Sequence, residues 1–178
     1  MRKLLSSELN RISLKTYKES TKTPIVIILD NVRSLNNIGS IFRTADAFLV
    51  ETIYLCGISA TPPHREIHKT ALGAEDTVAW RYETETLAAV EIVKEEGYEL
   101  IAVEQTDQSI SLNNYPIERD QRYALVFGNE IRGVDQEVVD RCTGSVEIPQ
   151  FGTKHSFNVS VTAGIVLWEW YRKMMLGK

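Results

Sequence analysis

The sequence predicts an α/β domain built on a mostly parallel β-sheet flanked by helices. Short runs of apolar, largely β-branched residues recur along the chain, and segments suited to helices lie between them. Each run is apolar throughout instead of alternating with polar residues, which is typical of strands buried on both faces. Alternation of such strands with helices favours a parallel sheet covered by helices.

The expected strands begin at residue 24. They cover residues 24–30 (PIVIILD), 51–57, 78–83, 98–105, 122–128 and 145–149. Helices are expected over residues 2–19, 38–48, 84–97, 135–141 and 156–175, with Thr84 as the N-cap and Gly97 as the end of the third helix. Because no repeat or linker divides the chain, we expect a basic helical extension over residues 1–23 and one domain over residues 24–178.

Composition limits the class of protein. The 178 residues, 43% hydrophobic and 25% charged, are typical of one globular domain with a real core. No apolar run approaches the roughly 20 residues of a membrane span, and no signal peptide is evident, so we expect a cytoplasmic protein without a membrane partner. Cys56 and Cys142 are expected to be buried free thiols, and no metal site is expected.

Charge is distributed unevenly along the chain. The net charge is −4, which by itself argues against nucleic-acid binding. Residues 1–23 carry six basic and two acidic residues, whereas residues 83–120 carry ten acidic and two basic ones. One face could therefore accept a polyanion, but a solvated basic helix explains the same pattern equally well. An RNA-binding role has to rest on the site itself.

The last helix carries two apolar stripes at helical spacing. One stripe contains Val161, Ile165 and Trp168, and the other contains Ala163 and Val166. A helix that is apolar on most of its circumference needs two surfaces to pack against. The sheet supplies one, and we expect a second copy of the chain to supply the other; the alternative is a fully interior helix in a monomer.

Unusual polar residues follow three of the predicted strands, at the sheet edge where parallel α/β sheets bind ligands. These segments are NNIGSIFRTA (36–45), FGNEIRGVD (127–135) and IPQFGTKHSFNVSV (148–161). Each alone has an ordinary structural explanation: a surface arginine, a turn with a capping acid, a serine N-cap at Ser156. Neither a G-x-G-x-x-G fingerprint nor a P-loop occurs, which disfavours dinucleotide and P-loop enzymes.

Taken in order, the three segments resemble the three motifs of the SpoU/TrmH branch of the SPOUT methyltransferases, and HKTALGAED (68–76) is also similar to the family at its place. The resemblance spans residues 24–175. It implies an RNA 2′-O-methyltransferase with a C-terminal trefoil knot, residues 24–178 as the catalytic domain, and S-adenosylmethionine as the cofactor. Gln150 and Phe157 depart from the usual Met and Leu.

The resemblance also implies which residues form the site. The catalytic residues would be Asn37, Arg43, Glu130, Ser156 and Asn158. The cofactor-binding residues would be Phe127, Gly128, Asn129, Ile148, Pro149, Phe157 and Val159.

Several alternatives remain open at this stage. Arg43 could stabilise a developing alkoxide and grip a phosphate, which we favour because arginine keeps its proton, or it could act as a base. Rival functions are a non-catalytic RNA-binding module, a nucleotide-dependent enzyme and a base methyltransferase. The RNA could be tRNA or rRNA, with tRNA slightly favoured. His64 and His68 are expected to be surface residues and not metal ligands.

Overall fold

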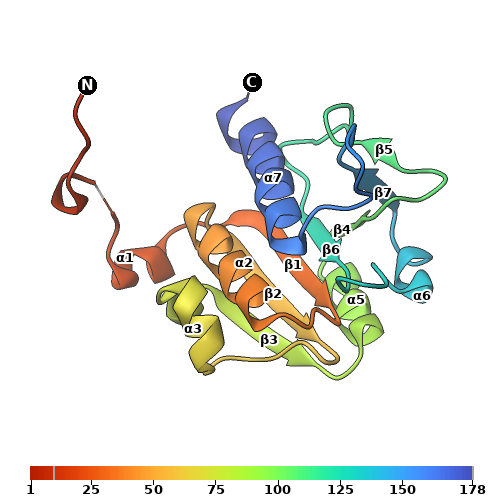
Figure 1. Ribbon diagram of the computed structural model, residues 1–178, viewed down its shortest axis with the longest axis horizontal. Helices are drawn as coiled ribbons and strands as arrows, with labels where there is room; N and C mark the ends of the chain where they lie inside the picture. Colours follow the sequence, from red (N-terminus) through yellow and green to blue (C-terminus); the bar gives the residue numbers. More distant parts are fainter. Residues whose placement is uncertain (10, 178) are drawn as a thin grey trace.

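The computed structural model describes residues 1–9 and 11–177. Position 10, which belongs to the predicted extension, and position 178, the last residue of the predicted domain, lie outside the described residues. Within this part of the chain, seven strands form one sheet in the order β3-β2-β1-β6-β4-β7-β5, and every pairing is parallel (Figure 1). The predicted parallel sheet is confirmed. The strands are β1 (Thr23–Asp30), β2 (Val50–Cys56), β3 (Ala79–Glu83), β4 (Glu99–Val103), β5 (Ile110–Ser111), β6 (Tyr123–Phe127) and β7 (Gly144–Glu147).

The central strands are buried on both faces, as their continuous apolar runs predict. All five residues of β6 are buried, and Ile27 of β1 pairs with Ile53 on one side and Leu125 on the other. Successive side chains of a strand point to opposite faces. Ile27 therefore packs into the core on one face, whereas Ile28 belongs to a second core on the other face.

Helices cover both faces of the sheet (Figure 1). The larger core joins one face to α2 (Leu35–Ala47), α3 (Arg65–Ala71), α4 (Ala74–Thr77) and α7 (Val159–Tyr171), and α7 continues as a π-helical turn over Arg172–Leu176. The smaller core joins the other face to α5 (Thr86–Glu95) and α6 (Gln136–Val139). The chain therefore has the expected three-layer arrangement. The trefoil knot stays a prediction.

The close contact between α2 and α3 depends on Gly39. A Cβ atom at Gly39 would overlap the Thr70 hydroxyl and the Ile67 carbonyl oxygen. The absence of a side chain lets α3 pack directly on α2, and the Thr70 hydroxyl donates to the Asn36 carbonyl at 3.0 Å. Gly39 thus serves helix packing.

The prediction of one continuous helix over residues 2–19 is wrong. The structure has a 3-10 turn at Ser6–Glu8 and a short helix α1 (Leu14–Glu19), which Ser13 caps. The apolar side chains that suggested a longer helix are exposed: Leu4, Leu5, Leu9, Ile12 and Leu14. Isolated helices of this length are marginal without tertiary packing, and only Tyr17 of α1 is buried.

Two other helix boundaries also differ from the prediction. Helix α5 begins at Thr86 and not at Thr84, because the Thr86 hydroxyl donates to the buried Asp30 carboxylate at 2.5 Å and fixes the start of the helix there. It ends at Glu95, with Glu96 as its C-cap, two residues before the predicted Gly97, which follows the cap with φ at +83°. The closing helix begins at Val159, three residues later than predicted. Helices α3 and α4 and the short strand β5 were not predicted.

Candidate active site

A cavity of about 530 Å³ opens at the carboxyl ends of β4, β6 and β7. This is the edge at which ligands bind in parallel α/β sheets, and the volume lies within the range of small-molecule and cofactor sites. The chain segments that line it are Val103–Gln105, Phe127–Gly133, Val146–Ile148, Gln150, His155–Val159 and Thr162. The second and third motif segments therefore form most of its wall.

Three side chains from the three motif segments form a continuous hydrogen-bonded chain. The Asn37 amide donates to the Glu130 carboxylate at 3.0 Å, and the Asn158 amide donates to the Asn37 side-chain oxygen at 3.1 Å. Asn37 is separated from each of the other two residues by more than 90 positions in the sequence. The fold thus brings the first motif segment into contact with the other two, as the predicted site requires.

Glu130 also holds the start of α2. Its two carboxylate oxygens accept the backbone N–H groups of Arg33 at 3.0 Å and Ser34 at 2.9 Å, just before the helix begins. Partial burial opposes ionisation of the carboxylate, but these two N–H donors outweigh burial, so the pKa of Glu130 lies below its ordinary value of 4.5. Glu130 is therefore an anion that orients α2 and Asn37. It does not contact Arg43.

Asn158 is the N-cap of α7. Its side-chain oxygen accepts the backbone N–H of Ser160 at 2.9 Å and that of Val161 at 3.4 Å, while its amide nitrogen reaches Asn37. The alternative explanation of Ser156 as the N-cap of this helix does not hold, since the helix starts three residues beyond it. Asn158 itself is exposed. One amide thus fixes both the helix start and the polar chain.

The turn after β6 is closed by reciprocal backbone bonds. The N–H groups of Asn129 and Gly133 each donate to the other's carbonyl oxygen at 2.9 Å, and the Asn129 side chain donates to the Asn31 carbonyl at 2.7 Å. A Cβ atom at Gly128 would overlap the backbone of Gly133 and Val134. The wall of the cavity is therefore a rigid backbone surface that requires glycine at position 128.

The charges around the cavity favour a cationic ligand. Three acidic residues, Glu104, Glu130 and Glu147, line it against one basic residue, Arg132. Glu104 follows β4, and its carboxylate accepts the Val134 N–H at 2.9 Å. This acid was missed in the sequence, although its place directly after a buried strand could have signalled it. Such a wall suits a sulfonium cation better than the phosphates of a nucleotide.

Six of the seven predicted cofactor-binding residues line the cavity. The seventh, Pro149, is not among the described residues that line it. Of the predicted catalytic residues, Glu130, Ser156 and Asn158 line the cavity, and Asn37 joins it through the hydrogen-bonded chain.

Arg43 does not lie with the others. It is exposed on α2, eight residues after Leu35 at the helix start, so its Cα lies about 9 Å further along the axis than that of Asn37. Arg43 is not among the described residues that line the cavity. Within one copy of the chain the site lacks the guanidinium that the motif pattern implies.

His64 and His68 have structural roles. The His64 ring accepts the Glu66 N–H at 3.1 Å and caps α3, and the His68 ring lies 2.5 Å from the Glu75 carboxylate. Across residues 1–9 and 11–177, no group of three or more His, Cys, Asp or Glu side chains is placed to hold a metal ion. The same residues contain no helix long and apolar enough to cross a bilayer.

Comparison with known proteins gives consistent matches. The sequence model of the SpoU rRNA Methylase family matches residues 24–168. The 23S rRNA (guanosine-2′-O-)-methyltransferase RlmB of Neisseria meningitidis is 33% identical over 168 residues, which are 94% of this chain and 66% of that protein. The chain thus spans about two thirds or less of the length of the curated relatives it matches.

Solved structures show the same fold. The TrmH/SpoU tRNA modifying enzyme of A. aeolicus superposes with a TM-score of 0.79 at 26% identity, covering 92% of this chain and 84% of that one. The AdoMet-bound rRNA methyltransferase from Sinorhizobium meliloti superposes with a TM-score of 0.79 at 24% identity, covering 89% of this chain and 60% of that one.

Proposed function

The chain belongs to the SpoU rRNA Methylase family, and from this premise we propose that it transfers a methyl group from S-adenosylmethionine to a ribose 2′-hydroxyl of structured RNA. The observation that carries the proposal is the hydrogen-bonded chain from Glu130 through Asn37 to Asn158 along the rim of an acid-lined cavity. The named relative at 33% identity is a ribose methyltransferase, which favours the ribose over a base.

The cavity walls fit S-adenosylmethionine. The backbone of Phe127–Asn129 and Ile148 would hold the nucleoside part, since glycine at position 128 lets the backbone of Gly133 and Val134 pack closely behind that wall. The carboxylates on the wall would balance the positive charge of the cofactor. When bound, the cofactor supplies an activated methyl group, so the transfer needs no metal. Phe157 and Val159 would close the apolar side.

The side chains around the cavity have separate proposed roles. Asn37 and Asn158 would orient the ribose, with Glu130 holding Asn37 in place, and the Ser156 hydroxyl would contact the reacting sugar. Arg43 would bind the neighbouring phosphate and stabilise the oxygen anion as the hydroxyl proton passes to water. The alternative role for Arg43, as the base itself, requires loss of its own proton, which an exposed guanidinium opposes.

We further propose that the enzyme is a homodimer through α7 and that Arg43 completes the partner's cavity. The stripe of α7 that faces away from the core leaves Val161 and Trp168 about half exposed, at 49% and 48%. Arg43 lies on α2, which packs beside α7 in the same layer (Figure 1). Dimerisation through this layer would carry Arg43 towards the second copy, which accounts for its distance from its own cavity.

The RNA is proposed to be tRNA in the first instance, and the location to be the cytoplasm. This chain covers 84% of the A. aeolicus tRNA modifying enzyme, but only 66% of the rRNA enzyme of N. meningitidis. The domain division proposed from the sequence, with residues 1–23 as a basic extension and residues 24–178 as the catalytic domain, is retained.

Transfer of tritium from labelled S-adenosylmethionine to RNA tests the proposed reaction. Undermethylated tRNA and rRNA are incubated separately with the protein and then hydrolysed in alkali. A 2′-O-methyl group removes the hydroxyl that alkaline cleavage uses, so the proposal predicts label in alkali-resistant dinucleotides. Label in single nucleotides would indicate a base methyltransferase, and RNA that binds without label would indicate a non-catalytic module.

A further inference from the structure

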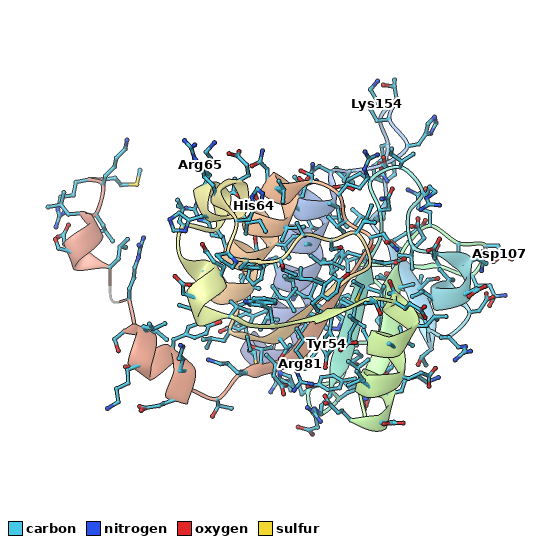
Figure 2. All side chains as sticks on the ribbon, turned by 90° about the horizontal axis from the view of Figure 1, so that it is seen from below. Tyr54, His64, Arg65, Arg81, Asp107 and Lys154 are labelled. Carbon is cyan, nitrogen blue, oxygen red and sulfur yellow. The ribbon has the colours of Figure 1, made fainter. Side chains whose placement is uncertain are left out.

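The loop that joins β7 to α7 presents an aromatic ring to solvent. Phe151 is 96% exposed, the most exposed aromatic side chain in the described part of the chain. The loop projects from the body of the molecule, and Figure 2 shows Lys154 at its outer tip, pointing away from the sheet. A phenylalanine held almost entirely in water has no contribution to make to the core, so its position calls for another explanation.

The base of this loop is attached to the cavity. The Gln105 amide donates to the His155 carbonyl at 2.8 Å, and the Gln150 amide reaches the same oxygen at 3.5 Å. Gln105, Gln150 and His155 all line the cavity. The segment that carries Phe151 and Lys154 therefore leaves the cavity wall at Gln150 and returns to it at His155.

The loop is basic in a chain that is acidic overall. Residues 148–158 contain Lys154 and His155 but no Asp or Glu, whereas the whole chain has a net charge of −4. The turn after β6 also lines the cavity, and there Arg132 follows Ile131, which is 76% exposed. Exposed apolar groups interleaved with cations at one rim are typical of surfaces that bind single-stranded RNA, because bases stack and phosphates pair with the cations.

We propose that Phe151 stacks on an unpaired base of the RNA beside the methylated nucleotide, and that Lys154 binds a nearby phosphate. This inference rests on the proposed function and adds the part of the substrate that the loop recognises. In the sequence Phe151 is flanked by Gln150, Gly152 and Thr153, none of which carries a large apolar side chain. A second protein copy would require a continuous apolar patch, which α7 offers and this loop does not.

Substitutions at position 151 separate stacking from simple apolar contact. Phe151→Ala and Phe151→Leu both remove the flat ring, but leucine keeps most of the apolar volume, and Phe151→Trp keeps a ring. Leu72→Ala is the matched control, because Leu72 is also exposed, at 64%, but lies at the end of α3. The probe is a fluorescein-labelled RNA hairpin with an unpaired loop, titrated by polarisation in the presence of S-adenosylhomocysteine.

The dissociation constant for the hairpin should rise about fivefold to a hundredfold in both Phe151→Ala and Phe151→Leu, the range expected for loss of one stacked base. Phe151→Trp and Leu72→Ala should bind as the wild type does. Cofactor affinity by isothermal titration and molecular mass by light scattering should be unchanged in all four variants.

The possible outcomes distinguish this proposal from the proposed reaction. If Phe151→Ala binds the hairpin as tightly as the wild type, or if Phe151→Leu binds normally, the stacking role is wrong while the methyltransferase proposal stands. A change in molecular mass would make the loop a contact between copies and would also overturn stacking. A wild-type protein that shows the predicted binding series but transfers no methyl group would overturn the reaction and leave the stacking role in place.

Discussion

At the scale of single residues, Arg43 and Asn37 lie on the same helix, α2, but only Asn37 belongs to the hydrogen-bonded chain at the cavity. Arg43→Ala is expected to abolish methyl transfer while leaving the affinity for S-adenosylmethionine unchanged, because Arg43 lies outside the cavity of its own chain. Isothermal titration and the tritium assay measure the two effects separately. A loss of cofactor affinity would contradict the proposed role, and Arg43→Lys should restore only part of the activity, since lysine cannot bind a phosphate through two parallel hydrogen bonds.

Gly128 offers a second prediction at this scale. Gly128→Ala should lower the free energy of unfolding by about 1–3 kcal/mol, because the added methyl group overlaps the backbone of Gly133 and Val134. Cofactor binding should fall with it. Gly152→Ala is the matched control, since a Cβ atom there meets no other atom within 4 Å. Urea unfolding checks the first effect, and equal stability of the two variants would contradict it.

At the scale of elements, the start of α2 depends on an ionised Glu130. A carboxylate whose pKa is lowered by folding stabilises the protein above its unfolded pKa of about 4.5, and this contribution is lost as the pH falls through the lower folded value. Glu130→Gln should therefore reduce the urea midpoint at neutral pH and should lose this difference from the wild type in acid. Midpoints measured from about pH 7 down to about pH 3 test this. A constant difference across the range would contradict it.

The sequence predicted elements best where burial is complete. Each of the six expected strands is present, and the longest unbroken apolar runs became β1 and β6, which are almost wholly buried. The edge strand β3 is also present, although none of its residues is buried. The short helix α3 was missed because only Ile67 and Ala71 are buried, too few to produce an apolar stripe. In the N-terminal segment the sequence predicted more helix than the structure contains. Its apolar side chains resemble an amphipathic helix, but no surface covers them.

The residues of the site were predictable only in part. The resemblance assigned Glu130, Asn37 and Asn158 to one site, but the hydrogen bonds that join them are known only from the structure. Glu104 could not be ranked above other acids from sequence alone, because its importance depends on the neighbouring Val134 N–H. The separation of Arg43 from the cavity was equally hidden, since it depends on where α2 begins.

At the scale of the whole molecule, the outward stripe of α7 should hold two copies together. Trp168→Glu is expected to convert a dimer of twice 20.2 kDa into a monomer of 20.2 kDa by light scattering, because a charge in an apolar interface is costly to bury. The circular dichroism spectrum should be retained, since Trp168 is half exposed in one copy. Leu72→Glu, on α3, should leave the mass unchanged. A wild-type monomer would contradict the proposed dimer.

The account as a whole rests on the cavity at the carboxyl ends of β4, β6 and β7. A crystal structure of the protein grown with S-adenosylmethionine tests this most directly. The account predicts the cofactor between the Phe127–Asn129 and Ile148–Pro149 segments, with its methyl group facing Ser156 and Asn158. Electron density for the cofactor at any other place, or a methyl group turned away from the polar chain, would contradict the assignment of the site.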